Sequence, residues 1–330
     1  MSKNNHSYKN ESQHRTKAII TEVHKGKVKV LCEYGEISAK LKGALFRNKS
    51  ELECVPVVGD DVWLLYNDSG DSWITEICKR RSFFVRTDFS GHGAGYVKTM
   101  QQQVLAANFD VVFVLASLNQ EFNLKRIERY LATALSSRAE VAILLTKADL
   151  VEDSRLFVDK VKAEFPNIAC YAISTVTRYG VECLEAYVQK GKIIVFLGSS
   201  GVGKSSLVNA LANETIMDVS EIREKDGRGR HTTTHRHLIL LSNGAMVMDT
   251  PGIRELGLWD VRHGLEEIFS DIEDYSSQCR FSDCTHRSEP GCKIQENLLN
   301  GNLSAERWQR YVSLQKENEW GKLKSPPVKK

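Results

Sequence analysis

The amino-acid sequence predicts a multidomain protein, with an all-β barrel at the N-terminus, an α/β domain in the centre and a mainly helical domain at the C-terminus. Three observations predict this order. Short β-rich segments separated by Gly, Asn and Asp fill residues 16–85, and residues 106–260 alternate between strand and helix patterns. From residue 261 the chain is polar and helical, with a cluster of Cys and His. We expect domains over 16–85, 106–260 and 261–330, a disordered tail over 1–15 and a linker over 86–105.

Composition and charge indicate an ordinary globular protein. The chain has 330 residues, 42% hydrophobic and 26% charged, which is usual for a globular protein. Its formal net charge is only +3, so affinity for nucleic acid requires local basic patches. The longest apolar runs, Val111–Ala116 and Ile193–Leu197, are too short to span a bilayer, and the polar N-terminal tail lacks the apolar core of a secretory signal. Scattered cysteines and one tight cluster fit a reducing compartment, so we expect a cytoplasmic protein without a membrane partner.

The first domain contains five strand-like segments: Ala18–Val23, Lys27–Leu31, Glu36–Leu41, Val62–Tyr66 and Ser72–Ile77. Five short strands in this length favour a small barrel, and the oligonucleotide-binding (OB) fold is the leading candidate. Other small barrels, and the role of a structural adaptor, remain open.

A basic and aromatic segment ends this region. Phe83 and Phe84 lie among four cations, Lys79, Arg80, Arg81 and Arg86. Such a segment can contact phosphates and stack on bases, but it can equally be a solvated linker anchored by two rings. The glycine-rich residues 90–97 predict a flexible connector.

The central domain alternates strands and helices. We expect strands at Val111–Leu115, Val141–Leu145, Ile168–Ile173 and Ile193–Leu197, and helices at Leu124–Leu135, Arg155–Glu164, Val181–Val188 and Ser205–Leu211. This rhythm predicts a mostly parallel sheet covered by helices on both faces. Asn243–Gly244 separates two further strands, Leu238–Leu241 and Ala245–Met248, and predicts a hairpin attached to that sheet.

A phosphate-binding loop follows the strand Ile193–Leu197. The residues Gly198, Ser199, Ser200, Gly201, Val202, Gly203, Lys204 and Ser205 match G-x-x-x-x-G-K-[ST], and Ser206 follows them. Glycines let successive backbone N–H groups surround phosphates, and the helix that begins there adds its positive dipole end. We expect Lys204 to reach the β- and γ-phosphates and the Ser205 hydroxyl to ligate Mg²⁺. The pattern after a strand and before a helix indicates a nucleotide site.

Three further segments indicate which nucleotide binds. Thr146, Lys147, Ala148 and Asp149 follow a buried strand and resemble the guanine-recognition motif of GTPases, Asn-Lys-x-Asp. That resemblance implies that Asp149 accepts hydrogen bonds from guanine, that Lys147 lies across the base, and that Ser174 belongs to the base-cradling loop. Asp249 and Gly252 form an Asp-x-x-Gly sequence, in which Asp249 holds Mg²⁺ through water and the Gly252 N–H meets the γ-phosphate.

Thr146 replaces the usual Asn, whose amide ties the guanine motif to the phosphate loop, and a threonine hydroxyl can make part of that contact. Asp149 precedes Gly198 in the chain, whereas ordinary GTPases have the reverse order, so the motifs are circularly permuted. The same sheet can still assemble, because strand adjacency does not require the usual chain order. A P-loop ATPase or kinase is the alternative, and nucleotide competition separates the two.

The cysteine cluster consists of Cys279, Cys284, His286 and Cys292. Three thiolates and one imidazole indicate a structural Zn²⁺ site with no open position, although buried thiols are the alternative on spacing alone. We expect the helix with Trp308, Tyr311 and Trp320 to pack on this module; RNA stacking is the other interpretation.

From about Thr16 onward the chain resembles the ribosome small-subunit-dependent GTPase A family: an OB-fold domain, a permuted GTPase domain and a zinc-containing C-terminal domain. Gly198–Ser206, Gly229–Thr234, Asp249–Gly252 and the cysteine cluster carry the resemblance. It implies a late assembly factor that binds the small ribosomal subunit and its rRNA, with GTP hydrolysis stimulated by the subunit and coupled to release. We expect a monomer. A nucleotide-switched RNA-binding protein with little hydrolysis is the alternative.

Residues 227–234, Gly-Arg-Gly-Arg-His-Thr-Thr-Thr, lie between the phosphate-loop helix and the hairpin, where a mobile switch loop is expected. Ile253 follows the Asp-x-x-Gly where many GTPases have a Gln that orients water, so we expect slow intrinsic turnover. The family resemblance suggests His231 as the group that positions water; solvated loop histidines are the alternative. One of Thr232, Thr233 and Thr234 should ligate Mg²⁺, and Thr234 is our choice.

Overall fold

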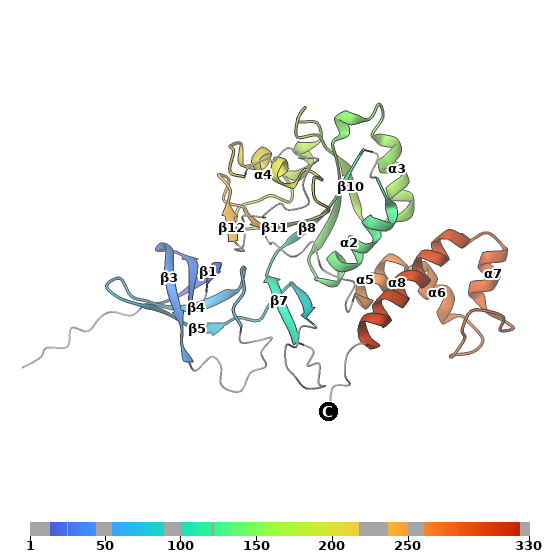
Figure 1. Cartoon of the computed structure of the whole chain (residues 1–330), viewed down its shortest axis with the longest axis horizontal. Coiled ribbons are helices and arrows are strands. Elements are labelled where there is room, and N and C mark those ends of the chain that lie inside the picture. Colours follow the sequence, from blue (N-terminus) through green and yellow to red (C-terminus); the bar gives the residue numbers. More distant parts are fainter. Residues whose placement is uncertain are drawn as a thin grey trace, which may run out of the picture.

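The computed structural model describes residues 14–24, 26–43, 55–88, 101–119, 122–217, 237–249 and 261–323. Figure 1 shows the N-terminal strands gathered into a β-barrel at the left, and the α/β region above β7 in the centre. The C-terminal helices lie at the right, beside α2 and α3. Within the described ranges, no helix combines the length and the apolar character that a membrane crossing requires.

The barrel strands are β1 (His14–His24), β2 (Lys27–Cys32), β3 (Gly35–Leu41), β4 (Asp61–Tyr66) and β5 (Ser72–Ile77). They follow the order β1-β2-β3-β5-β4, and β4 pairs again with β1, so the barrel is closed. Alternate side chains such as Ile20, Val30, Val62 and Ile74 fill its interior. All five predicted strands are confirmed, and β1 begins two residues inside the expected tail 1–15, because His14 and Arg15 pair with Tyr66 and Leu65.

The predicted linker 86–105 is wrong at both of its ends. Residues 86–88 belong to β6 (Phe83–Asp88) and residues 101–105 to β7 (Gln101–Ala107), and the two strands pair antiparallel. Val104 and Leu105 of β7 are both buried and pack in two different hydrophobic clusters, so this segment is part of the core. The connector expected at 90–97 lies outside the described residues.

The basic and aromatic segment, which runs into the start of β6, anchors the chain. Phe84 is buried and stacks on Phe109, with ring centroids 4.5 Å apart. The Arg80 guanidinium donates to both carboxylate oxygens of Asp60, at 2.7 and 2.8 Å, and Arg81 pairs with Asp110 at 3.1 Å. Burial raises the pKa of the Asp60 carboxyl, and Arg80 opposes that shift. Phe84 and these two arginines therefore fit the interpretation of an anchored segment better than that of a surface that stacks on bases.

Asn108 joins the barrel to the α/β domain. Its buried side chain accepts a hydrogen bond from the Arg81 N–H at 2.8 Å and donates one to the Gly59 carbonyl at 3.0 Å. Gly59 has a positive φ of 89°, and a Cβ there would lie 2.0 Å from the Ala107 carbonyl oxygen. The barrel therefore contacts the end of β7, which leads into the central sheet, through a backbone approach that only glycine permits.

The central sheet contains β8 (Val111–Ser117), β9 (Glu140–Thr146), β10 (Ala169–Ala172), β11 (Ile193–Leu197), β12 (His237–Leu240) and β13 (Met246–Asp249). Its order is β10-β9-β8-β11-β13-β12; neighbouring strands are parallel except for the antiparallel β12–β13 hairpin. The mostly parallel sheet and the hairpin are confirmed. Glu22 of β1 pairs with His237 of β12, so the barrel continues this sheet.

Helices cover both faces of the central sheet, as predicted. The elements are α2 (Leu124–Ser136), α3 (Arg155–Glu164), α4 (Lys204–Ala212) and the 3-10 turns η2 (Ala148–Leu150) and η3 (Val181–Leu184). Ile127 and Val161 of α2 and α3 pack on one face, and Leu207 and Leu184 of α4 and η3 on the other. The segment expected as a helix at Val181–Val188 is a 3-10 turn that begins after Gly180.

The C-terminal region contains α5 (Arg262–Ile268), α6 (Ser270–Ser277), α7 (Lys293–Leu299) and α8 (Ala305–Leu323). Helix α5 crosses α2 so closely that a Cβ on Gly264 would lie 2.0 Å from the Ala132 carbonyl oxygen. The buried side chains Leu265, Phe269 and Ile272 join the same core as α2. The helical region therefore packs directly on the α/β domain.

Candidate functional site

Three parallel strands end at one edge of the central sheet. β9 ends at Thr146, β8 at Ser117 and β11 at Leu197, and β8 lies between the other two. In open α/β sheets, ligands bind outside the carboxyl ends of the strands. The loops that follow β9 and β11 carry the predicted guanine and phosphate motifs, so both motifs lie at this edge.

The phosphate loop forms a tight turn between β11 and α4. Gly201 and Gly203 have φ of 72° and 101°, a backbone conformation that favours glycine, and α4 begins at Lys204. The Lys204 ammonium lies over the turn and donates to the carbonyls of Gly198 at 2.6 Å and Ser199 at 3.2 Å. A helix N-terminus together with an ammonium group forms a site suited to phosphates.

The guanine motif is held by backbone and side-chain bonds. Lys147 has a φ of 59°, and the Ala148 N–H donates to the Ile173 carbonyl at 3.1 Å. The Ser174 hydroxyl donates to Asp149 Oδ1. This bond fixes one carboxylate oxygen of Asp149 and leaves the other, Oδ2, without a described hydrogen bond.

The two motifs contact each other. The Thr146 hydroxyl donates to the Val202 carbonyl of the phosphate loop at 2.6 Å. The structure therefore makes the threonine contact that we expected in place of an asparagine amide. Although Asp149 precedes Gly198 in the chain, the fold brings both motifs into one site.

Part of the predicted site lies outside the described residues. The strand β13 ends at Asp249 and runs parallel to β11, so its backbone reaches the same edge of the sheet as the phosphate loop. The side chain of Asp249 is not described. Gly252, Ile253, His231 and the three threonines Thr232–Thr234 also lie outside the described ranges, as does the Gly229–Thr234 segment.

A small cavity beside the phosphate loop was not predicted from the sequence. It is lined by Ser199 of the loop, Ser117 at the end of β8, and Asn123 and Arg126 at the start of α2. The buried Ser117 hydroxyl has no hydrogen-bond partner among the described residues, and the Asn123 side chain caps α2 by accepting from the Lys125 and Arg126 N–H groups. The sequence offers a helix cap at Asn123, but no local pattern places it beside Ser199.

The cysteine cluster has the geometry of a metal site. The ligand atoms of Cys279, Cys284, His286 and Cys292 all lie within 4.8 Å of one another. His286 Nδ1 is 3.6 Å from the Sγ atoms of both Cys279 and Cys292. Tetrahedral Zn²⁺ with ordinary bond lengths separates its sulfur and nitrogen ligands by about 3.5 to 3.8 Å. The described donors therefore fit a four-coordinate ion of the zinc type.

Outer contacts orient these donors. His286 Nε2 lies 3.1 Å from the Ser276 hydroxyl, which leaves Nδ1 facing the cluster, and the Lys293 N–H donates to Cys279 Sγ at 3.4 Å. The His286 ring meets Trp308 of α8 at right angles, with centroids 5.8 Å apart, and Trp308 stacks on Tyr311. The expected packing of this helix on the cluster is thus observed for Trp308; the side chain of Trp320 is not described.

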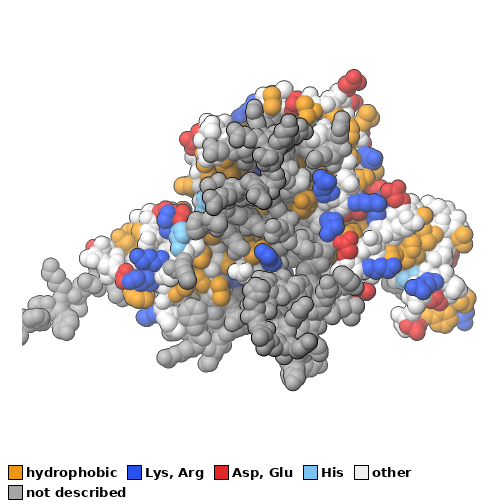
Figure 2. Space-filling model, viewed as in Figure 1, with side chains coloured by type: hydrophobic (Ala, Val, Ile, Leu, Met, Phe, Trp, Pro, Cys, Tyr) orange, Lys and Arg blue, Asp and Glu red, His pale blue; other side chains and the backbone are white. Residues whose placement is uncertain are grey.

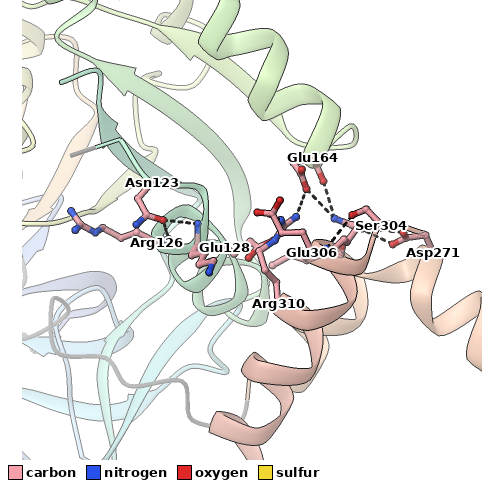
Figure 3. A network of polar contacts seen from close by, with 11 residues as sticks. Asn123, Arg126, Glu128, Glu164, Asp271, Ser304, Glu306 and Arg310 are labelled. Carbon is pink, nitrogen blue, oxygen red and sulfur yellow. Dashed lines mark hydrogen bonds and ion pairs between the residues drawn. The ribbon is translucent and has the colours of Figure 1, made fainter. Parts of the chain in front are cut away.

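Charged side chains join α8 to α2 and α3 (Figure 3). Arg310 donates to Glu128 of α2 at 2.8 Å and also pairs with Glu164 at the end of α3. The Glu128 side chain is 1% exposed and that of Arg310 is 5% exposed. Arg307 pairs with Asp271 at 2.8 Å and with Glu164 at 3.6 Å. The helix that packs on the cysteine cluster is therefore fastened to the nucleotide-binding domain.

Basic side chains lie on the solvent side of α2. Lys125, Arg126 and Arg129 are exposed there, and Figure 2 shows Lys and Arg side chains interspersed with acidic ones where the α/β domain meets the C-terminal helices. Arg129 pairs with Glu317 of α8 at 3.3 Å.

Comparisons with known proteins identify the family to which the chain belongs. The family model of the RsgA GTPase matches residues 77–259. The small ribosomal subunit biogenesis GTPase RsgA 1 of Listeria innocua is 41% identical over 309 residues, which cover 94% of this chain and 85% of that protein. The small ribosomal subunit biogenesis GTPase RsgA of Methanosarcina acetivorans is 40% identical over 299 residues, covering 90% and 78%.

Two solved structures share the fold. The crystal structure of YjeQ from Thermotoga maritima has a TM-score of 0.65 and 28% identity, covering 91% of this chain and 97% of that one. YloQ, described as a circularly permuted GTPase, has a TM-score of 0.63 over 99% of this chain and 100% of its own, and at 24% identity it supports the fold alone. The motif order, the sheet and the extent of these matches together show that the chain belongs to the RsgA GTPase family.

Proposed function

We propose that this protein hydrolyses GTP at the joined phosphate and guanine motifs, and that it acts in biogenesis of the small ribosomal subunit. The hydrogen bond between Thr146 and Val202 supports the first part most directly, because it brings the two motifs into one site. The names of the relatives, which describe small ribosomal subunit biogenesis GTPases, support the second part.

Guanine recognition is assigned to four residues. Asp149 accepts hydrogen bonds from the guanine N1–H and 2-amino groups, and the Lys147 stem lies across the base. Ala148 and Ser174 complete the base side of the site; the bond from Ser174 to Asp149 supports this assignment. GDP should therefore compete for the site with a fluorescent guanine nucleotide, whereas ADP should not.

Phosphate binding is assigned to the loop that contains Gly198, Ser199, Ser200, Gly201, Val202, Gly203, Lys204, Ser205 and Ser206. Lys204 provides the positive charge, and Gly252 meets the γ-phosphate. Ser205, Asp249 through water and Thr234 would hold Mg²⁺, which would neutralise charge on the phosphates.

Hydrolysis requires a group that positions water, because Ile253 replaces the usual Gln. We assign this role to His231 and expect slow turnover without the ribosomal subunit. The His231→Ala variant should lose subunit-stimulated turnover while it binds GTP normally, and unchanged turnover would remove His231 from the mechanism.

The cysteine cluster is proposed to hold one structural Zn²⁺ through Cys279, Cys284, His286 and Cys292, since the donor atoms fit that ion.

The closed five-stranded barrel is proposed to be an OB-fold that contacts rRNA, because its strand order is that of a small closed barrel with consecutive β1-β2-β3 pairing. We further propose that the protein is a cytoplasmic monomer and that GTP hydrolysis is coupled to its release from the small ribosomal subunit.

The deciding experiment measures GTP hydrolysis with purified small and large ribosomal subunits. Small subunits should raise the rate strongly, and large subunits should not. The Lys204→Ala variant is the control for contaminating hydrolases, because it removes the ammonium group of the phosphate loop. Equal rates with both subunits, or none above the Lys204→Ala background, would contradict the proposal.

A further inference from the structure

The loop between β10 and η3 lies directly behind Asp149. The Ser174 N–H donates to the Tyr179 carbonyl at 2.9 Å and closes the loop. The N–H groups of Val176 and Thr177 donate to the Ser174 hydroxyl at 3.2 Å, and the same hydroxyl donates to Asp149 Oδ1. Displacement of this loop therefore reaches the Asp149 carboxylate through the Ser174 side chain, beside the backbone bond from Ala148 to Ile173.

Arg178 ties the opposite side of this loop to the helix of the phosphate loop. Its Nη1 donates to the Ala210 carbonyl at 2.8 Å, and its Nη2 donates to Asn213 Oδ1 at 3.1 Å. Ala210 lies in the last turn of α4, and Asn213 is the residue that ends this helix. Arg178 itself is exposed and has a φ of 65°, a conformation that is uncommon for residues other than glycine.

The chemistry of a helix end explains the contact. The last carbonyls of a helix have no partner within the helix and carry partial negative charge, so a cation there is favourable. Helix α4 has no basic residue in its own last turn. Arg178 supplies that charge from another loop, 32 residues before Ala210 in the chain.

Helix α4 is thus connected to the guanine side of the site at both ends. At its start, Thr146 binds the Val202 carbonyl of the phosphate loop. At its end, Arg178 binds Ala210 and Asn213. These two connections add to the pairing of β9, β8 and β11 in linking the phosphate-binding and base-binding parts.

We propose that Arg178 is a positioning residue for guanine recognition, which fixes the base-side loop against the end of α4 and so holds Ser174 and Asp149 in place. Arg178 acts through these residues and not on the nucleotide. The inference rests on the proposed function, in which Asp149 recognises guanine.

Inosine nucleotides provide a readout that a purely structural role would not change. Guanine offers Asp149 two donors, N1–H and the 2-amino group, whereas hypoxanthine offers only N1–H. A loosely held carboxylate makes the two-point contact less well, so the advantage of GDP over IDP should shrink. The dissociation constants of GDP and IDP are measured on the full-length protein with zinc and Mg²⁺, by competition with a fluorescent guanine nucleotide.

The Arg178→Met variant keeps the length of the side chain and removes both hydrogen bonds. We expect it to weaken GDP binding by about 5- to 30-fold, IDP binding by clearly less, and to leave the melting temperature nearly unchanged. Asn213→Gly removes one of the two partners of Arg178, and glycine tolerates the positive φ of 55° at this position. This variant should reduce the preference for GDP over IDP by less than Arg178→Met does. Arg178→Lys should restore part of the preference.

Arg155→Met is the matched control, because Arg155 is an arginine of α3 whose side chain is 85% exposed and, among the described residues, pairs only with its near neighbour Asp153. It should leave both constants unchanged. If Arg178→Met weakens GDP and IDP equally, or neither, the inference is overturned. Asp149→Ala tests the foundation separately: if that variant keeps the full GDP preference, guanine recognition by Asp149 fails, whatever Arg178 does.

Discussion

Replacing Arg310 with Met should destabilise the contact between the C-terminal helices and the nucleotide-binding domain. Arg310 of α8 bonds Glu128 of α2, and these side chains are 5% and 1% exposed. Removal of the guanidinium leaves the Glu128 carboxylate buried without its partner. Breaking a buried pair in this way costs about 3 to 5 kcal/mol, and we expect a loss of that size in the free energy of unfolding.

Two further variants separate charge burial from lost packing. Arg129→Met removes an arginine from the same α2–α8 contact, but Arg129 and Glu317 are 51% and 43% exposed, so the loss should stay below about 1 kcal/mol. The double variant Glu128→Met with Arg310→Met removes both charges and should recover most of the stability, because a buried pair replaced by apolar side chains is often nearly neutral.

The loss should also depend on pH. Burial raises the pKa of the Glu128 carboxyl even with Arg310 present, and the pKa rises further without that cation. A raised pKa favours the protonated folded state, so this stability is present at low pH and disappears as the pH rises through the folded pKa. The penalty of Arg310→Met should therefore be larger at pH 7.5 than at pH 5.

Urea unfolding followed by circular dichroism, with zinc present throughout, measures these differences. A loss for Arg310→Met no greater than that for Arg129→Met would refute the reasoning. So would a double variant as unstable as the single one, because the penalty could not then come from an unpaired carboxylate.

Three other changes test separate contacts. Thr146→Val removes the hydroxyl between the motifs and should speed GDP dissociation about 5- to 20-fold in stopped-flow fluorescence, and an unchanged rate would show that this bond does not hold the site together. Chelation of zinc should release His286 from the cluster and change the fluorescence of Trp308, whose ring lies 5.8 Å away, with recovery when zinc returns; no spectral change on metal loss would argue against a metal there. Gly264→Ala places a Cβ 2.0 Å from the Ala132 carbonyl oxygen and should cost about 2 kcal/mol or more in urea unfolding, and a loss below about 0.5 kcal/mol would mean that the helices separate easily.

Local patterns were sufficient for the elements that build the site. The strand Ile193–Leu197 is a continuous buried run. The glycines after it permit the positive φ values that the tight turn has at Gly201 and Gly203. Short β-rich segments bounded by Gly, Asn and Asp also predict each barrel strand. The two motifs lie together because they follow parallel strands that end at the same edge of the central sheet.

Long-range pairs were not predictable from such patterns. The Arg310–Glu128 bond joins residues 182 positions apart, and Arg178 contacts α4 across 32 positions. Neither residue differs in local sequence from an ordinary surface arginine. The β6–β7 pair was missed because the glycine-rich residues 90–97 between the strands favour a linker, whereas contacts between segments far apart in the chain, such as Phe84 stacked on Phe109, join its ends.

The pairing of Glu22 with His237 makes the barrel and the nucleotide-binding sheet a single hydrogen-bonded surface. β12 forms a hairpin with β13, and β13 ends at Asp249, so only two strands separate the barrel from the segment that follows Asp249. A tilt of the barrel would therefore act directly on β12 and β13, as far as Asp249, through the hydrogen bonds between neighbouring strands.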